Sequence, residues 1–404
     1  MQLTLVVPEL VWPEPDDHDS LDRLPCAGLG TLIARSQLSR CPPQSMEATL
    51  CDAFGVAENA AYGAFRVLGE SCCPTTVDAC WLCADPVHLR LHQERLILAD
   101  GGSLGIELAE AHAIVGELNR HFADVGTFHA TAADRWYLQL AAGTDLGCFD
   151  VLPLSAVAGR SVGRQLPETP EARWLRQLLN EAQMVLHQHP ANERREDEGR
   201  STINSLWLWG AGQLPAGASR GFAGVWSDNV LARGLGRAFN VPVHAVPGNA
   251  GTFLAQAPRG SRQLLVLDSL QSPVQYEDTD AYRAGLLNLE ARWFAPLQKA
   301  LASGKIQGMR LVASTAYAAL TWHSDRRAQW QLWRRPRSLA ATAQALARGE
   351  QLPTSAAAPS RRASSGNSSN RACTRCWRAS TPRAGSAPAA NSTTTWRLCS
   401  HRPG

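Results

Sequence analysis

The chain has 404 residues, a formal net charge of +3, 45% hydrophobic residues and 19% charged residues. This length allows two domains or one large domain with an insertion, and the apolar fraction excludes a wholly disordered or fibrous chain. No run of about 18 apolar residues is present, so we expect no membrane span. The N-terminal residues Met1–Pro8 lack the cationic start of a secretory signal, and we therefore expect a cytoplasmic protein.

The C-terminal residues differ sharply in charge from the rest. Residues 351–404 contain eight Arg and no Asp or Glu, whereas residues 1–350 hold 31 basic and 36 acidic residues, a net charge of −5. No apolar period runs through this Ser-, Ala-, Pro- and Arg-rich stretch, so we expect residues 346–404 to be a disordered tail. It is either an arm that binds nucleic acid or an acidic partner, or an out-of-frame end of a GC-rich gene, and we favour the second interpretation.

Four of the eleven cysteines form two pairs with the spacing of metal-binding motifs. Cys80 and Cys83 form one CxxC pair, and Cys373 and Cys376 form another almost 300 residues away. Paired zinc motifs are normally about 15–20 residues apart. Cys80 and Cys83 lie in an apolar segment, so we expect buried structural thiols there, with a zinc site as the less favoured alternative.

Short apolar runs alternate with helical periods along the chain. Apolar residues spaced three and four apart predict helices, and uninterrupted apolar runs predict buried strands. The strand of residues 204–209 is expected to end in a glycine turn, Gly210–Gly212. In chain order we expect a strand at 3–7, a strand at 79–84, a helix at 108–122, strands at 135–140 and 204–209, helices at 175–187 and 230–238, strands at 241–246 and 264–267, a helix at 282–297 and a strand at 310–313.

This alternation predicts an α/β fold, because buried strands between helices are typical of a mostly parallel sheet covered on both faces. Ligands of such sheets bind beyond the carboxyl ends of the strands. Asp268, Gly210 and Ser314 all follow predicted strands, and we expect them at that edge.

Three segments together resemble one family. The strongest runs from His189-Pro-Ala-Asn192 through Arg195 to Ile203-Asn-Ser-Leu-Trp-Leu-Trp-Gly-Ala-Gly212; the others are Val241–Gly248 and the region from Cys80 to Leu140, which includes Asp134-Arg-Trp-Tyr137. These segments are similar to archaeal-type, cofactor-independent phosphoglycerate mutases of the alkaline-phosphatase superfamily. The pattern looks closest to a bacterial subset described as RpfE-type regulatory proteins.

The resemblance implies a domain organisation. We expect an alkaline-phosphatase-like core formed by residues 1–61 and 166–345, with residues 62–165 as a smaller inserted α+β domain. It also implies a chemistry, because these enzymes use two divalent metal ions and a serine nucleophile that accepts and returns the phosphoryl group.

The implied metal ligands are only partly present. Glu9 and Asp268 stand where the family has carboxylate ligands, and His323 stands where it has an imidazole. Three further ligand positions correspond to Ser272, Ala313 and Ser314. Serine and alanine do not supply the charge or the nitrogen that holds a divalent ion. The resemblance places the nucleophile at Ser45, by a short match, although a serine there is also an ordinary helix N-cap.

Other residues of the strongest segment are candidates for ligand binding. We expect Asn192, Arg195, Asn204, Gly210 and Gly212 to contribute to a residual pocket for a phosphorylated or carboxylated metabolite. The favoured function is therefore a regulatory or metabolite-binding scaffold with a degenerate metal site and no cofactor. The alternatives are an active mutase or phosphotransferase with Mn or Mg held by a rearranged site, and a protein that binds nucleic acid through its tail.

Overall fold

The fold was analysed in a computed structural model, which describes residues 1–12, 21, 24–56, 61–70, 79–144, 151–162, 172–215, 221–315 and 318–347. The predicted C-terminal tail lies outside these residues apart from 346 and 347, which end a helix, and the pair Cys373 and Cys376 also lies outside them. The described residues belong to a single compact unit. The division into a core and an insertion at residues 62–165 stays a prediction.

The first sheet has seven strands, and its centre is parallel as the sequence predicted. β1 pairs in parallel with β10 and β11, and β10 continues in parallel through β8 to β9, whereas β12 and β2 add an antiparallel edge. In sheet order the strands are β2 (Gln37–Cys41), β12 (Ala319–Asp325), β11 (Gly308–Ser314), β1 (Gln2–Val6), β10 (Arg262–Val266), β8 (Gly224–Trp226) and β9 (Val243–His244).

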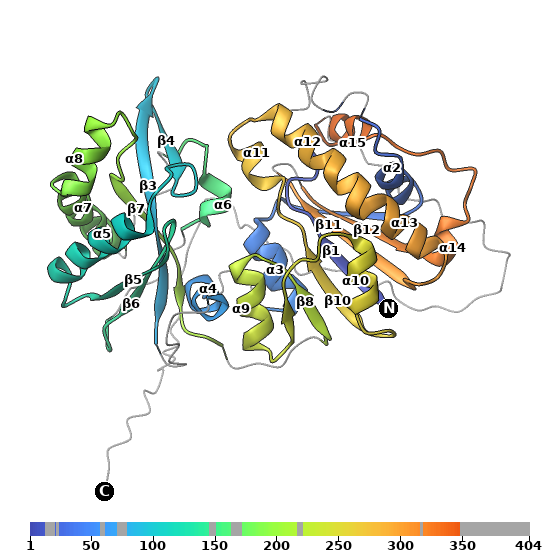
Figure 1. The fold of residues 1–404 in the computed structure, drawn as a ribbon, viewed down its shortest axis with the longest axis horizontal. Coiled ribbons are helices and arrows are strands. Elements are labelled where there is room, and N and C mark those ends of the chain that lie inside the picture. Colours follow the sequence, from blue (N-terminus) through green and yellow to red (C-terminus); the bar gives the residue numbers. More distant parts are fainter. Residues whose placement is uncertain are drawn as a thin grey trace, which may run out of the picture. The chain divides into compact units, whose positions relative to one another are not determined.

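Helices cover both faces of this sheet (Figure 1). Leu3 and Leu5 of β1 pack into a cluster with the long helical segment of residues 279–302, and Val6 packs with α3 and α9 on the other face. The helices of this part are α2 (Ala27–Ala34), α3 (Met46–Phe54), α4 (Tyr62–Gly69), α9 (Val230–Ala238), α10 (Ala250–Gln256), α11 (Gln271–Gln275), α12 (Thr279–Leu289), a π-helical segment (Glu290–Phe294), α13 (Ala295–Ala302), α14 (Arg326–Gln329) and α15 (Leu339–Ala347).

The second sheet has five strands, all antiparallel to their neighbours. The strands are β3 (Trp81–His92), β4 (Arg95–Asp100), β5 (Gly126–Ala132), β6 (Arg135–Leu140) and β7 (Ser205–Gly212). The helices that belong to this part of the chain are α5 (Leu108–His121), α6 (Leu154–Val157), α7 (Arg173–His187) and α8 (Pro190–Asp197). None of the helices in the described ranges has the length and apolar character needed to cross a membrane.

One predicted strand belongs to a different sheet from the one expected. The sequence suggested that residues 204–209 end in a glycine turn at the carboxyl edge of a parallel sheet. Instead, β7 runs on to Gly212 and pairs antiparallel with β3. Gly210 has a φ angle of 65°, and a Cβ atom there would lie 2.7 Å from the Tyr62 Cβ. The glycines therefore let α4 approach this strand closely.

Helices α4 and α9 cross in close contact through two glycines. A Cβ atom on Gly234 would lie 1.7 Å from the Phe65 carbonyl oxygen, and one on Gly69 would lie 1.8 Å from the Val230 carbonyl oxygen. No side chain fits in this space. The crossing fixes α9, and with it the loop that precedes α9, against the helix that lies beside the second sheet.

We predict that Gly234→Ala lowers the free energy of unfolding by at least about 1–3 kcal/mol, because the methyl group forces the two helices apart. Gly116→Ala in α5 is the matched control, since a Cβ atom there has no neighbour within 4 Å. It should leave stability unchanged or raise it by up to about 1 kcal/mol. Urea unfolding followed by circular dichroism measures both, and equal effects of the two variants would contradict the tight crossing.

Candidate functional site

A cavity of about 430 Å³ lies at the carboxyl ends of β8 and β10 and is lined from both sheets. The first sheet contributes Asp228 and Asp268, which follow those strands, and the second contributes Arg135 and Trp209. Helix α4 contributes Arg66. This is the edge at which α/β sheets bind ligands, so it is the best candidate for the functional site.

Asp268 lies at this cavity as the sequence predicted. Its Oδ2 accepts a hydrogen bond of 3.2 Å from the Asn229 side chain, whose own oxygen caps α9 by accepting from the backbone of Leu231 and Ala232. Burial raises the pKa of Asp268 above its ordinary value. The Asn229 hydrogen bond opposes this shift.

A buried ion pair forms the wall on the side of the second sheet. Arg66 Nη1 lies 2.7 Å from Asp85 Oδ2 of β3, and Trp209 Nε1 donates to the same oxygen at 2.9 Å. The guanidinium also lies 5.1 Å from the Trp209 ring centroid. Burial disfavours the Arg66 charge, but Asp85, Tyr137 and Cys83 together outweigh this effect, and the pKa of the guanidinium is raised above its ordinary value. Arg66 is therefore a fixed positive charge.

Arg135 is the second cationic side chain of the cavity. Its Nε donates to Glu70 Oε1 at 2.8 Å, and the Tyr137 hydroxyl donates to the same oxygen at 3.0 Å. About a third of the Arg135 side chain (34%) stays exposed. Asp134 and Asp100 line the cavity nearby, so each cationic group is accompanied by carboxylates.

Ser45, the predicted nucleophile, begins α3 beside the cavity. Its Oγ accepts from the Ala48 backbone at 3.1 Å, which confirms the helix N-cap. The following residues Met46 and Glu47 line the cavity. The Glu47 carboxylate accepts from Ser155 Oγ at 2.6 Å and is also hydrogen-bonded by Ser45. Burial raises the pKa of Glu47.

Glu9 follows β1 at the same edge of the sheet but does not line the cavity. Its backbone N–H donates to the Ser314 carbonyl, and its φ angle is 54°. The side chain is largely buried, with Arg160 Nη2 3.8 Å from Oε1. Oε2 is buried without a hydrogen-bond partner in the described part of the chain. Burial raises the pKa of Glu9 to about 7, although Arg160 opposes the shift.

The structure does not bring His323 to Glu9 and Asp268. Thr315 and Ala318 close a tight turn between β11 and β12, and β12 then returns along the sheet so that His323 pairs with Arg310. The resemblance implied that His323 is a metal ligand together with Glu9 and Asp268, but the antiparallel return of β12 carries it toward the opposite end of the sheet. His323 lines a different cavity, together with Thr4 and Gln37.

The other ligand-binding candidates use their polar groups within the protein. Asn192 bonds the backbone of Leu186 and Ile203, and Asn204 bonds both backbone groups of Leu89. Arg195 is buried and bonds Glu110 and the carbonyls of Leu104 and Ser201. Neither these three residues nor the glycines Gly210 and Gly212 line the cavity. These residues therefore have structural roles in α8, in β7 and in the residues between them, beside the second sheet.

A pair of divalent metal ions needs several carboxylate or imidazole ligands at one place. At this edge Asp228, Asp268 and Glu9 offer carboxylates, but Ser272, Ala313 and Ser314 occupy the further ligand positions that the resemblance implies. Within the described ranges, no three His, Cys, Asp or Glu side chains are grouped closely enough to hold a metal ion. This donor set does not fit a dinuclear metal centre.

Three buried charged residues at or beside the cavity, Glu47, Arg66 and Asp85, were not predicted from the sequence. A signal was available for Arg66, because it interrupts the apolar run Tyr62–Leu68, and a buried arginine requires a buried partner. Nothing in the local sequence identifies Asp85 as that partner. Cys83 is buried as predicted, beside this ion pair, and burial raises the pKa of its thiol to about 12.

Curated relatives match parts of the chain, whereas no known family profile matches it. A probable 2,3-bisphosphoglycerate-independent phosphoglycerate mutase from Geobacter sulfurreducens is 38% identical over 106 residues, 25% of this chain and 27% of that protein. A 2,3-bisphosphoglycerate-independent phosphoglycerate mutase from Methanothermobacter thermautotrophicus is 32% identical over 164 residues, 39% of this chain and 40% of that protein. The chain is phosphoglycerate mutase-like over these stretches, which span well under half of either relative.

Two solved structures have weaker likenesses. A Pyrococcus horikoshii protein aligns with a TM-score of 0.49 and 14% identity over 80% of this chain and 87% of that chain. A cofactor-independent phosphoglycerate mutase from Thermoplasma acidophilum aligns with a TM-score of 0.40 and 15% identity over 85% of this chain and 94% of that chain. Because both TM-scores are below 0.5, the fold described above rests on this chain alone.

We predict that Glu9→Gln stabilises the protein at pH 8 and has little effect at pH 5. The raised pKa of Glu9, about 7, means that the folded protein favours the protonated carboxyl. This contribution is fully present below the ordinary pKa of 4.5 and is lost as the pH rises through 7. A shift of this size corresponds to about 3 kcal/mol at high pH. Urea unfolding of both proteins at the two pH values measures the difference, and an equal effect at pH 5 and pH 8 would contradict it.

Proposed function

We propose that this chain is a phosphoglycerate mutase-like protein that has lost two-metal phosphoryl transfer and acts by binding a small metabolite, in a regulatory role. The observation that carries the proposal is the cavity beside Asp268. Ser272 lines this cavity where the resemblance implies an imidazole metal ligand, yet the walls of the cavity are built from many buried, hydrogen-bonded side chains. A cavity with an ordered, hydrogen-bonded lining and without a full set of metal ligands is suited to binding a small molecule.

The charges of the cavity limit which ligand fits. About a third of the Arg135 side chain (34%) is exposed, and a phosphate or carboxylate group of the ligand would bind there. Asp100, Asp134 and Asp228 line the same space and, when ionised, only accept hydrogen bonds. A ligand that suits both Arg135 and the aspartates is a small molecule with one anionic group and hydroxyl donors, such as a phosphorylated or carboxylated hydroxy acid.

Binding of 3-phosphoglycerate to the full chain tests this proposal by isothermal titration calorimetry. We expect saturable binding that Arg135→Gln weakens by about tenfold or more, because a charge-assisted hydrogen bond is lost. Arg194→Gln is the control, since Arg194 is exposed on α8 and does not line the cavity. Circular dichroism establishes that both variants are folded.

Mutase turnover measured on the same sample with added manganese tests the loss of catalysis. We expect none above the background rate without protein. Metal-dependent turnover would overturn the loss of phosphoryl transfer. Absence of 3-phosphoglycerate binding, or equal weakening by Arg135→Gln and Arg194→Gln, would overturn the assigned ligand class.

A second candidate function rests on Ser45. This hydroxyl lies at the N-terminus of α3, beside residues that line the cavity, and it is hydrogen-bonded to the Glu47 carboxyl. A serine beside a carboxylate can act as a nucleophile when the carboxylate accepts its proton. An active phosphotransferase would then carry its phosphoryl group on Ser45. Detection of phosphoserine at this position by mass spectrometry after incubation with 3-phosphoglycerate, and its absence in Ser45→Ala, would favour this candidate.

A further inference from the structure

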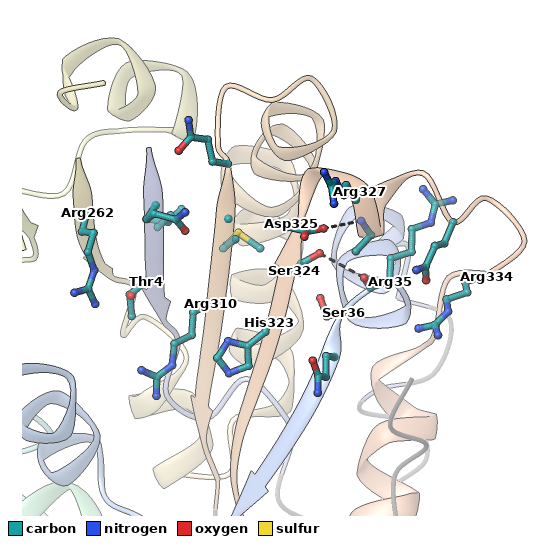
Figure 2. A pocket seen from close by; sticks show the side chains of 18 residues that line it. Thr4, Arg35, Ser36, Arg262, Arg310, His323, Ser324, Asp325, Arg327 and Arg334 are labelled. Atoms are coloured by element: carbon teal, nitrogen blue, oxygen red, sulfur yellow. Dashed lines mark hydrogen bonds between the residues drawn. The ribbon is translucent and has the colours of Figure 1, made fainter. Parts of the chain in front are cut away.

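A second cavity, of about 810 Å³, lies at the opposite end of the first sheet. It is lined where β1, β10 and β11 begin, and β12 and α14 complete it. Figure 2 shows Thr4, Arg310 and His323 side by side on neighbouring strands, with Arg262 beyond Thr4. The strand register agrees, because Thr4 pairs with Arg310 and Arg310 pairs with His323.

The cavity is strongly basic. Five arginines line it, and Asp325 is the one carboxylate among the lining residues, where it caps α14 by accepting from the Ala328 backbone at 2.7 Å. Burial, and then the charge of Arg310, lower the pKa of His323. The five arginines are Arg35, Arg262, Arg310, Arg327 and Arg334.

Two of these arginines have donors without acceptors. The Nε atoms of Arg310 and Arg35 are buried and have no hydrogen-bond partner within the described residues. Arg310 has one nearby carboxylate, Asp52 of α3, with 3.8 Å between Nη2 and Oδ2, and both side chains are substantially exposed. Such a pair contributes little, so the charge of Arg310 is not neutralised. A buried donor without an acceptor is costly, and an anion that binds the exposed part of the Arg310 side chain would stabilise its charge.

We propose that this cavity is a binding site for a small, multiply charged anion with phosphate groups, held by Arg310, His323 and Arg262. Phosphate oxygens match the planar fork of the arginine guanidinium. Thr4 adds a hydroxyl donor between the basic side chains. The site is separate from the cavity beside Asp268, with which it shares no lining residue.

The test is calorimetric titration of the full chain with inorganic pyrophosphate. We expect saturable binding that Arg310→Gln weakens by about tenfold or more, because one charged donor is removed. Arg310→Lys should retain part of the affinity. Arg173→Gln, an exposed position on α7, and Arg135→Gln, in the other cavity, should leave the affinity unchanged. The second control separates this site from the proposed metabolite cavity.

Two results would overturn the proposal. One is the absence of pyrophosphate binding by the folded wild-type protein, or binding that Arg310→Gln and Arg262→Gln leave unchanged. The other comes from a single-stranded oligonucleotide and from vesicles that contain anionic phospholipid. If either binds through Arg310 while pyrophosphate does not, the site recognises a macromolecule or a membrane surface instead of a small anion.

Discussion

The buried ion pair between Arg66 and Asp85 fixes helix α4 against the second sheet, and the candidate site depends on that position. Separating a buried charge from its partner costs several kcal/mol of folding free energy. The position of α4 is therefore set by Asp85, which binds Arg66 and also accepts a hydrogen bond from Trp209. Helix α9 then packs on α4 through glycines. Asn229 begins α9 and holds the Asp268 carboxylate. The orientation of Asp268 in the first sheet is thus coupled to the second sheet by continuous contacts.

These contacts explain how a cavity can persist while its chemistry changes. The walls depend on Arg66, Asp85 and the helix crossing, none of which is an implied metal ligand. The serine at position 272, where the resemblance implies an imidazole ligand, takes no part in those contacts. The side chains that shape the cavity are therefore different from those at the metal-ligand positions that the resemblance implies. A chain can lose metal-dependent chemistry and keep a shaped, hydrogen-bonded cavity that still selects a ligand.

The sequence predicted the elements well and the long-range contacts poorly. Helical periods and apolar runs are local, so α5, α7, α9 and the parallel strands β1, β10 and β11 were recognised from them, whereas the three-residue strand β8 was not predicted. The sheet to which β7 belongs was not, because an apolar strand pairs equally well in either sheet until its partner β3 is known. His323 was grouped with Glu9 and Asp268 by the resemblance alone, and the antiparallel return of β12 along β11, which separates it from them, has no local signal in the sequence. Asp85 carried no local signal, because its role is set by Arg66.

The two ends of the first sheet differ in the origin of their charge. At the carboxyl ends the chain enters helices, and the positive N-terminal end of a helix favours a nearby carboxylate, as with Glu47 in the first turn of α3. Carboxylates can therefore gather there beside Asp268. At the amino ends of β1, β10 and β11 the chain enters strands, so positive potential has to come from side chains, and Arg262 and Arg310 supply it. The proposed ligands at both ends are anions, but the charged groups around them differ, and because the two cavities share no lining residue, binding at one need not compete with binding at the other.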